Sequence, residues 1–392
     1  MRKLMDVCEL IVDCPHTTAP DEGAGYPLIR TPNIGKGRLI LDNVHRVCKE
    51  VYDARNARAI PQADDIILAR EAPAGNVALI QKGQEVCLGQ RTVLIRADKE
   101  KVNPVYLTYY LLAPKQQHDL KSSANGATVG HINMPRIRGL KVDLPVLSIQ
   151  RKIAEILSAY DNLIDNYRRQ IKLLEEAAQR LYKEWFVDLH FPGYEHTKIV
   201  DGVPKGWKKS NVGSLCTLRK SLVSTDKLPT DCAYIGLEHM PRIDFCLSKW
   251  GKVDSIASSK YRYKEDDIIF GKIRPYFHKV GFAINEGVVS SDSFVMTANK
   301  GYWAILLMTV FDKAFVDYTY QTCKEGAKMP RADWKYMKAY KVLIPSESIR
   351  MQFEDYVWNI SRLIKSIALQ NNVLTEARDR LLPRLMSGEI KV

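Results

Sequence analysis

The chain has 392 residues, 46% of them hydrophobic and 26% charged, and its formal net charge is +13. These values are ordinary for a soluble protein of two or three domains. The longest apolar patch, near residues 302–310, is about half a membrane span, which excludes a transmembrane helix. None of the eight cysteines forms a C-x-x-C pair, which argues against a zinc ribbon and a disulfide framework.

We therefore expect reduced thiols in a cytoplasmic protein that has no signal peptide and no contact with a membrane. The positive charge leaves two interpretations open. The chain is either a merely basic soluble protein or the partner of a polyanion, usually nucleic acid.

Residues 1–145 predict a mixed globular unit. Short β-rich runs begin at Asp65, Val77 and Thr92, and Gly and Pro separate them. The sequence predicts a helix from Pro104 to about Leu112, capped by Asn103. Residues 121–138 are polar and predict an exposed loop.

Residues 146–190 predict a long helix, because 148–188 contains neither Gly nor Pro and its apolar residues recur every three or four positions. The same pattern returns 200 residues later, in 346–392. Aligned without a gap, 144–181 and 344–381 share 11 of 38 residues, where unrelated helices would share about two or three. The chain is therefore an internal duplication.

Between the two helices lie a Pro- and Gly-rich linker, 191–207, and a second globular unit, 208–345. The run Asp266-Asp-Ile-Ile repeats Asp64-Asp-Ile-Ile of the first unit, and Gly326-Ala327 repeats Gly126-Ala127. The sequence thus predicts the order globule, helix, globule, helix, with globules that have diverged more than the helices.

Two helices with one apolar edge each are buried most simply against each other. A duplication favours antiparallel packing about a pseudo-twofold axis, and Gln170 and Gln370 would then meet near that axis and fix the register; pointing to solvent is the alternative for both. The helix–helix seam is expected at Ile153, Tyr160, Leu163, Tyr167, Gln170, Leu174, Leu181, Phe353, Ile360, Leu363, Ile367, Gln370, Leu374 and Leu381. Further apolar residues on the outer faces predict both a partner surface and packing against the chain's own globules.

No catalytic or metal motif emerges. Asp64-Asp65 and Asp266-Asp267 could be metal carboxylates, but no Glu-x-Lys follows, and a turn before a strand is the better interpretation. No phosphate-binding P-loop and no His spacing suited to a metal are present.

Basic and amide side chains in equivalent loops predict instead that the globules bind DNA, because such groups pair with phosphates and base edges. Any single one could equally be a solvated surface charge. The candidates are Arg30, Thr31, Asn33, Lys36, Arg38, Arg70, His131, Asn133 and Arg136 in the first unit and Arg219, Lys220, Arg242, Lys272, Arg274, Lys279, Lys328 and Arg331 in the second.

Together these features resemble the specificity subunit of type I restriction–modification enzymes over the full length. The motifs are Leu144-Pro-x-x-x-Ile-Gln and Ile344-Pro-x-x-x-Ile before the helices, the two Asp-Asp-Ile-Ile strands, Leu181-Tyr-Lys-Glu-Trp-Phe-Val-Asp, and the ending Leu381-Leu-Pro-Arg-Leu-Met-Ser-Gly-Glu-Ile. Arg350, where the first copy has Gln150, departs from the repeat.

The resemblance implies an α+β fold in which two long antiparallel coiled-coil helices separate two target-recognition domains. It implies a non-catalytic reader of a bipartite site in double-stranded DNA, with the helices setting the spacer. Partners would be modification (methyltransferase) subunits and restriction (translocase and nuclease) subunits, two of each. S-adenosylmethionine, ATP and Mg would be bound by those partners and not by this chain. A stand-alone bipartite-site DNA-binding protein is the alternative.

Overall fold

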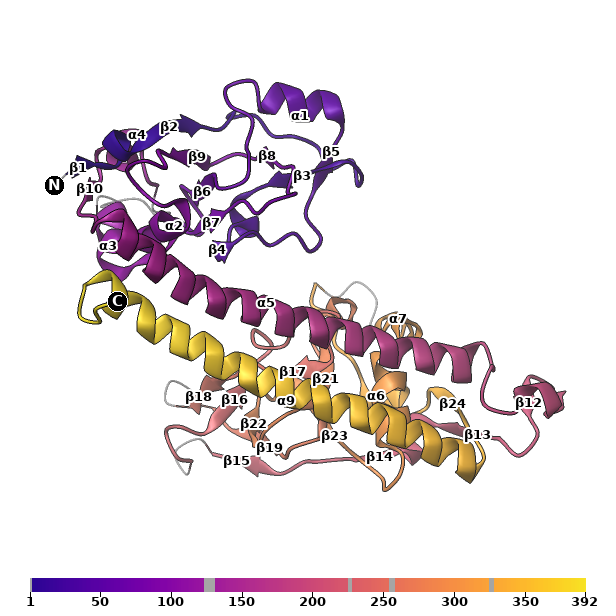
Figure 1. Ribbon diagram of the computed structural model, residues 1–392. Coiled ribbons are helices and arrows are strands. Elements are labelled where there is room, and N and C mark those ends of the chain that lie inside the picture. Colours follow the sequence, from indigo (N-terminus) through magenta and orange to yellow (C-terminus); the bar gives the residue numbers. More distant parts are fainter. Residues whose placement is uncertain (1, 123–130, 225–227, 254–257, 324–327) are drawn as a thin grey trace. The chain divides into compact units, whose positions relative to one another are not determined.

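In the computed structural model (Figure 1) the chain forms two compact units. The first unit comprises Met1–Ile164 and Leu374–Val392, and the second comprises Asp165–Val373. The structure describes residues 2–122, 131–224, 228–253, 258–323 and 328–392. The repeated Gly-Ala pairs, 126–127 and 326–327, lie outside the described residues. Each long helix contributes residues to both units.

The first unit is built on a five-stranded sheet with the order β2-β9-β6-β7-β4 and a three-stranded sheet with the order β5-β3-β8. A short pair, β1 and β10, joins the beginning of the unit to the residues before the long helix. The elements are β1 (Arg2–Lys3), η1 (Leu4–Val7), β2 (Cys8–Asp13), β3 (Tyr26–Ile29), η2 (Thr31–Asn33), β4 (Lys36–Arg38), β5 (Arg46–Val47), α1 (Lys49–Arg55), β6 (Ile66–Ala69), β7 (Val77–Leu79), β8 (Cys87–Leu88), β9 (Thr92–Ala97), α2 (Pro104–Leu112), α3 (Pro114–Lys121), α4 (Met134–Gly139) and β10 (Lys141–Val142).

Strand β6 shows how the sequence divides the core between two faces. Ile66 and Leu68 pack against helix α2, whereas Ile67 and Ala69 pack against the smaller sheet. Successive strand residues point to opposite faces, so a fully apolar run fills both sides of the central strand.

The second unit repeats this plan. Its larger sheet has the order β14-β23-β20-β21-β17 and its smaller sheet β15-β19-β22-β16-β18. The elements after the long helix are η4 (Tyr194–His196), β11 (Ile199–Val200), β12 (Val203–Pro204), β13 (Lys208–Asn211), η5 (Val212–Ser214), β14 (Cys216–Leu218), β15 (Leu222–Val223), β16 (Ala233–Ile235), β17 (Cys246–Leu247), β18 (Gly251–Lys252), β19 (Lys260–Tyr263), β20 (Ile268–Gly271), η8 (Pro275–Phe277), β21 (Val280–Ala283), β22 (Gly287–Val289), β23 (Ser293–Ala298), α6 (Trp303–Phe311), α7 (Lys313–Gln321), α8 (Trp334–Met337) and β24 (Lys341–Ile344).

The two larger sheets agree strand by strand. In each, three antiparallel pairings are followed by one parallel pairing at the edge, β4 with β7 and β17 with β21. The pair β13–β24 occupies the place of β1–β10. The duplication inferred from the helices therefore extends to the globules.

The long helices are α5 (Leu147–Tyr182) and α9 (Glu347–Met386), and a π-helical turn, η3 (Lys183–Val187), follows α5. The two helices begin at Leu147 and Glu347, one residue before Ser148 and Ser348. Pro383 does not end α9, which continues to Met386. The predicted helix α2 is confirmed with its cap, since Asn103 Oδ1 accepts a hydrogen bond from the Tyr106 N–H at 2.9 Å. The expected loop at 121–138 instead contains helix α4.

Within each unit the helices pack antiparallel (Figure 1). In the first unit Asp161 of α5 meets Arg378 of α9, while Leu385 joins the core around Ile153. In the second unit the ring centroids of Trp185, beyond the end of α5, and Phe353, near the start of α9, lie 5.7 Å apart. Earlier residues of one helix thus face later residues of the other in both units.

The buried stripe lies one position beyond the expected seam. Leu163 and Leu363 are 38% and 50% exposed, and Gln170 and Gln370 are also exposed, so they do not meet in a buried core. Ile153, Phe353 and Ile367 are buried as expected; Tyr160, Tyr167, Leu174, Leu181, Ile360, Leu374 and Leu381 are half-buried. The stripe proper contains Ala154, Leu157, Asp161, Ile164, Glu175 and Ala178 on α5.

The helical period was correct, but its phase was not. Apolar residues occupy both adjacent positions at Leu163-Ile164 and at Leu363-Ile364, so apolar spacing alone cannot select between two stripes. The buried stripe also contains the polar residues Asp161, Glu175 and Ser361. These residues interrupt its apolar pattern, so the sequence does not indicate that it is the buried one.

The expected α+β class, with mixed globules and two long helices, is confirmed. The eight cysteines are free thiols. Among the described residues, no helix combines the length and the apolar character that a membrane crossing requires.

Candidate nucleic-acid interface

The acidic pair before each central strand forms a turn. Asp65 accepts a hydrogen bond from the Gln62 N–H at 2.9 Å, and Asp267 accepts one from the Lys264 N–H at 2.8 Å. Asp64 and Asp266, one residue earlier in each unit, have left-handed backbones. No cluster of His, Cys, Asp or Glu in the described part of the chain could hold a metal ion. The turn interpretation is confirmed by these hydrogen bonds and by the left-handed backbones.

Four of the DNA-binding candidates in the first unit have polar atoms engaged in contacts within that unit. Arg70 is 6% exposed and forms an ion pair with Asp13 at 2.7 Å, and its Nε donates to the Ile132 carbonyl at 2.9 Å. Thr31 and Asn33 are buried in the turn η2, and Asn133 caps α4. These contacts give each side chain a structural role, and contact with DNA stays a prediction for them.

The remaining candidates of the first unit lie nearer the surface. Lys36 and His131 are exposed, and His131 Nδ1 lies 2.6 Å from Glu71. Arg38 donates to Asn162 of α5 at 2.6 Å, and Arg136 donates to the carbonyl of Asp119. Arg30 is half-buried, and its Nε–H finds no acceptor in the described part of the chain.

Arg219 has the same role in the second unit as Arg96 has in the first, although it follows β14 whereas Arg96 lies on β9. Its guanidinium contacts Asp267 at 2.7 and 3.2 Å and Thr297 at 3.1 Å, just as Arg96 holds Asp65. Such a pair neutralises a carboxylate that is 3% exposed. Lys220 beside it is exposed.

The other basic candidates of the second unit gather around one turn, η8, between β20 and β21. Arg242 lies over the ring of Phe277, 4.0 Å from its centroid, and Arg274 lies 5.7 Å from the same ring. Lys272 lies 4.5 Å from the ring of Phe294. Lys279 donates to the carbonyl of Leu237, Arg331 pairs with Asp292, and Lys328 is exposed.

Electrostatics in this cluster are dominated by like charge and burial. Burial lowers the pKa of Lys272, and Arg331 lowers it further. Burial and then Arg242 lower the pKa of Lys279. An anion bound beside these lysines would offset the repulsion from the neighbouring arginines.

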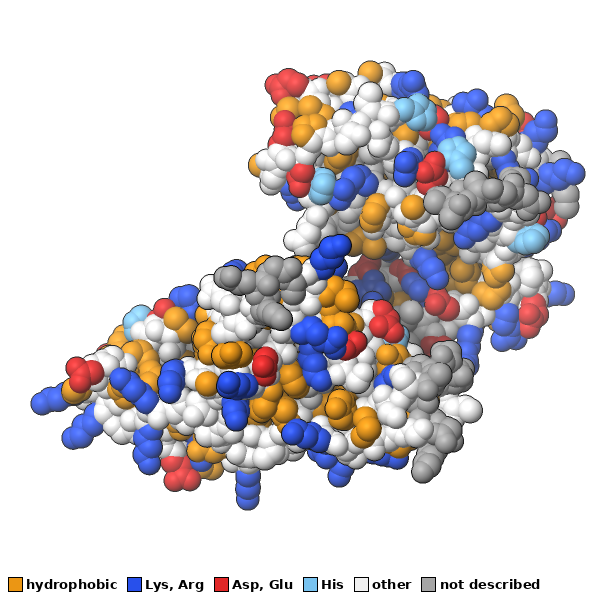
Figure 2. Space-filling view, turned by 180° about the vertical axis from the view of Figure 1, so that it is seen from behind, with side chains coloured by type: hydrophobic (Ala, Val, Ile, Leu, Met, Phe, Trp, Pro, Cys, Tyr) orange, Lys and Arg blue, Asp and Glu red, His pale blue; other side chains and the backbone are white. Residues whose placement is uncertain are grey.

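Sequence reasoning missed the aromatic members of this surface. Tyr276 and Tyr320 are 45% and 47% exposed, and their ring centroids lie 5.2 Å apart. The signal was available in the run Arg274-Pro-Tyr-Phe-His between two apolar strands. Figure 2 shows lysine and arginine side chains interspersed with hydrophobic ones over the visible face of each unit, so charge alone does not single out this cluster.

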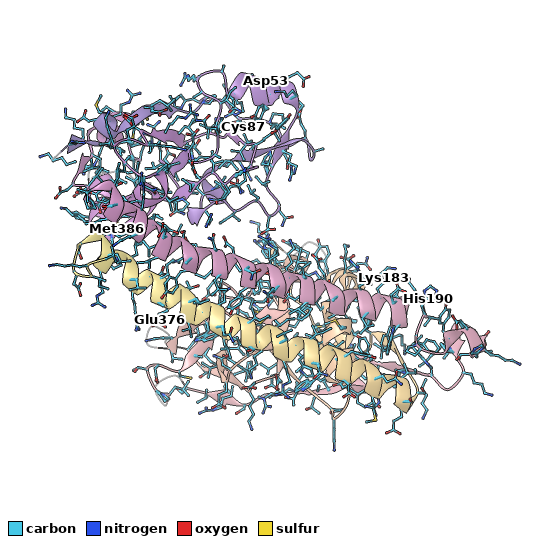
Figure 3. All side chains as sticks on the ribbon, viewed as in Figure 1. Asp53, Cys87, Lys183, His190, Glu376 and Met386 are labelled. Atoms are coloured by element: carbon cyan, nitrogen blue, oxygen red, sulfur yellow. The ribbon has the colours of Figure 1, made fainter. Side chains whose placement is uncertain are left out.

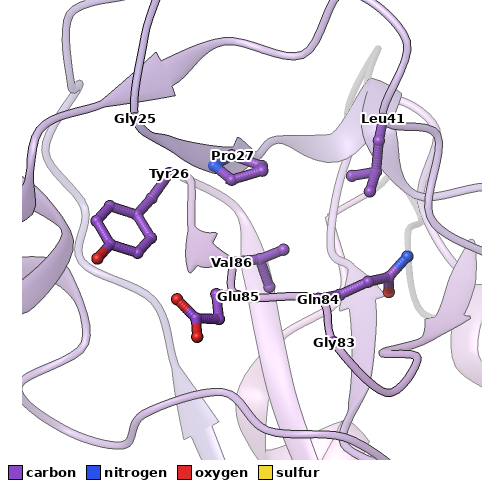
Figure 4. Close-up of a pocket in the computed structure, with 8 residues that line it drawn as sticks. All are labelled: Gly25, Tyr26, Pro27, Leu41, Gly83, Gln84, Glu85 and Val86. Atoms are coloured by element: carbon purple, nitrogen blue, oxygen red, sulfur yellow. The ribbon is translucent and has the colours of Figure 1, made fainter.

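An open hollow of about 560 Å³ lies in the first unit (Figure 4). Tyr26, Pro27, Leu41 and Val86 supply its apolar wall, and Glu85 is the charged residue in its lining. A carboxylate repels phosphate, so this hollow is a poorer candidate for nucleic acid than the cationic turn of the second unit.

Comparison with known proteins shows which class of protein this chain is similar to. Residues 1–176 match the family model of the type I restriction modification DNA specificity domain. The chain is 26% identical to the MjaIX type I restriction enzyme specificity subunit of Methanocaldococcus jannaschii, across 83% of this chain and 78% of that protein. The HindI specificity subunit of Haemophilus influenzae is 21% identical, with 93% and 95% of the two chains covered.

A solved structure supports the fold. The crystal structure of the type I restriction–modification S subunit from M. genitalium covers 98% of this chain and 95% of its own, with a TM-score of 0.59 at 15% identity. The resemblance inferred from the sequence is thus confirmed, and this chain is similar to the type I specificity subunits in sequence and in fold.

Proposed function

We propose that this chain is the non-catalytic, DNA-reading subunit of a type I restriction–modification complex in the cytoplasm. Each unit reads one half of a bipartite site, and the helix pair α5–α9 sets the distance between the halves. Two modification subunits dock on the helices and bind S-adenosylmethionine, and two restriction subunits bind ATP and Mg. The specificity-domain family match and the duplicated fold support this proposal.

The helix repeat carries the proposal. Five pairs that are identical at an offset of 200 are exposed in both helices: Ser148/Ser348, Leu163/Leu363, Gln170/Gln370, Glu176/Glu376 and Arg180/Arg380. Figure 3 labels Glu376 on α9. Buried pairs differ at Asp161/Ser361 and Leu157/Val357, whereas Ile164/Ile364 is both buried and identical.

Packing normally restrains buried residues more than exposed ones. The five identical exposed pairs, which packing does not explain, therefore indicate a shared binding requirement. One kind of partner, bound once to each repeat, accounts for it. A stand-alone repressor would need no such surface.

Docking is tested by Leu163→Glu and Leu363→Glu in the chain co-expressed with the modification subunit of its host. Each single variant is expected to lose one modification subunit and the double variant both, measured by native mass spectrometry. Leu173→Glu, at a position 59% exposed and matched by Val373 rather than by Leu, is the control. Full stoichiometry in the double variant would favour the stand-alone alternative.

The spacer is tested by lengthening both helices together. The units divide between Ile164 and Asp165 on α5 and between Val373 and Leu374 on α9, so insertions there leave each unit intact. One heptad in both helices preserves the buried stripe and adds about 10.5 Å. The recognised site should then gain about three base pairs of spacer at 3.4 Å each, with both half-sites unchanged. Methylation mapping that shows the original gap would contradict the spacer role.

A further inference from the structure

We infer that the turn 274–278 of the second unit is its base-reading element, with Tyr276 and Arg274 contacting base pairs of double-stranded DNA. This inference rests on the proposed DNA-reading function. It assigns that function in the second unit to one turn, and it gives the first unit a different reading surface.

The turn is held rigidly although its backbone is unfavourable. Arg274 and His278 have left-handed backbones, with φ of 51° and 53°, and neither is glycine. The Arg274 N–H donates to the Pro330 carbonyl at 2.8 Å, and His278 Nε2 lies 2.6 Å from the Phe311 carbonyl. Strain of this kind persists where surrounding contacts enforce it, and it concentrates at functional sites.

The held turn presents an exposed aromatic side chain. Tyr276 is 45% exposed, and its ring stands nearly perpendicular to those of Phe277 and Tyr320, at centroid distances of 4.9 and 5.2 Å. Rings supported in this way keep their orientation while one edge stays open. A supported aromatic or apolar side chain can enter a groove and pack on base edges or between base steps.

Two arginine side chains stand beside that ring, and one of them, Arg274, has an unused donor. Arg242 and Arg274 both lie over Phe277. Arg274 Nε is buried, and none of the described residues offers it an acceptor. An arginine held over an aromatic face has few conformations to lose, and its fork matches the two acceptors of guanine. Lys272 and Arg331 lie on the same surface and suit phosphates.

The fold does not require these side chains. In the first unit the same turn joins β6 to β7 with Ala72, Pro73, Ala74 and Gly75. A residue just before each turn forms the same backbone hydrogen bond to a segment about 60 residues later in the chain. The Ile132 N–H donates to the Arg70 carbonyl at 3.0 Å, and the Ala332 N–H donates to the Lys272 carbonyl at 2.8 Å. Since small residues suffice for the scaffold, the cationic and aromatic ones serve another purpose.

Double-stranded DNA is the ligand that fits both the cationic and the aromatic side chains of this surface. Its phosphates match the cations, and its base edges offer acceptors to Arg274 and apolar contact to Tyr276. A protein partner would meet a cluster of like charge that its own carboxylates would have to neutralise. The turn is therefore assigned to DNA.

The test uses the full complex with its modification subunits and compares methylation maps. Tyr276→Ala and Arg274→Gly, the latter compatible with the left-handed backbone, should each reduce discrimination by about 10-fold at base pairs of one half-site. The other half-site and the spacer should stay unchanged. Tyr194→Ala removes another exposed aromatic residue, 38% exposed, and should leave the map unaltered.

Three results would overturn the inference: an unchanged map for both variants, relaxation of both half-sites, or a uniform loss of methylation with no change in sequence preference. Altered subunit stoichiometry in the variants would assign the turn to a protein partner and would overturn it as well. If the unsubstituted complex itself showed no bipartite preference, the proposed function would fail instead, so the two failures are distinct.

Discussion

The two units build one scaffold with different polar interiors. Where α5 and α9 meet in the first unit, Asp161 forms an ion pair with Arg378 at 2.6 Å and accepts a hydrogen bond from Tyr109 Oη, also at 2.6 Å. The corresponding residues of the second unit are Ser361, Ala178 and Met308. Ser361 is 3% exposed, and its hydroxyl has no hydrogen-bond partner within the described ranges.

The difference shows that the sheet order and the helix pairing do not depend on this ionic cluster. Buried ion pairs contribute little net stability relative to apolar residues of similar volume, whereas losing one partner is costly. The cluster is therefore one of two ways to fill the same helix–helix interface. The difference in DNA reading that we propose lies in the loops of the two units and does not involve this interface.

Breaking the cluster has the largest expected effect. Arg378→Ala leaves the Asp161 carboxylate, 3% exposed, without its cation and should destabilise the first unit by about 3–5 kcal/mol. Calorimetry on the complete chain would report a lower unfolding temperature for that unit. The transition of the second unit should not move.

Rebuilding the cluster in the manner of the second unit is the matched control. The triple variant Tyr109→Met, Asp161→Ser and Arg378→Ala removes both charges together and should recover at least half of the lost stability. A triple variant no more stable than Arg378→Ala would show that the interiors are not interchangeable.

The second largest effect is expected at the buried aspartates before the central strands. Asp65 takes its arginine from β9, as Arg96, whereas Asp267 takes Arg219, which follows β14. Arg219→Leu should cost the second unit about 2–3 kcal/mol, because hydrogen bonds to a buried charge are lost. Denaturant unfolding measures the change.

Moving the cation should restore the pair. Thr297 occupies on β23 the place of Arg96 on β9, and it already donates to Asp267 at 2.7 Å. Arg219→Leu with Thr297→Arg should therefore be more stable than Arg219→Leu alone. Equal stability of the two variants would refute the equivalence of the strands.

These pairings mark the limit of what the sequence could predict. The helix at 104–112 with its cap, the strands at 66–69 and 268–271, and the period of both long helices follow from local patterns. The ion pairs do not, because Arg219 and Asp267 are 48 residues apart and Asp161 and Arg378 are 217 apart.

The same limit explains why the sequence predicted the candidate site only in part. Arg70 and Arg219 resembled surface cations in the sequence, and only the fold shows that Asp13 and Asp267 hold them. Tyr276 and Tyr320 come from separate elements, so no local pattern joins them. Basic residues in loops could be found from the sequence, but their division into structural and exposed groups could not.

A smaller difference between the units is expected in how their stability depends on pH. Glu175 of the second unit is 3% exposed, and its Oε1 accepts hydrogen bonds from the N–H groups of Phe245 and Cys246 at 3.0 and 3.1 Å. Burial, aided by the negative charge of Asp244, raises its pKa from 4.5 to about 8. The equivalent position in α9, which belongs to the first unit, is Thr375.

The folded second unit then binds one proton more than the unfolded chain between about pH 4.5 and 8. Its stability should fall as pH rises through that window, by at most about 1.4 kcal/mol per pH unit, and should level off above it. Glu175→Gln keeps the accepting Oε1 and should abolish this slope. Unfolding series from pH 5 to 9 that run parallel for the two proteins would refute the assignment.

The smallest effect on stability is expected at the N-termini of the equivalent helices α2 and α6. Asn103 caps α2 with its own side chain, whereas Tyr302 begins α6 without a side-chain cap, and Glu354 of α9 accepts the N–H groups of Trp303 and Ala304 at 2.9 and 3.0 Å. Asn103→Ala should therefore cost the first unit about 1 kcal/mol. Tyr302→Asn should change the second unit by less than about 0.5 kcal/mol, because the donors that a cap would satisfy are already bonded. A gain in the unfolding temperature of the second unit as large as the loss in the first would mean that Glu354 does not replace the cap.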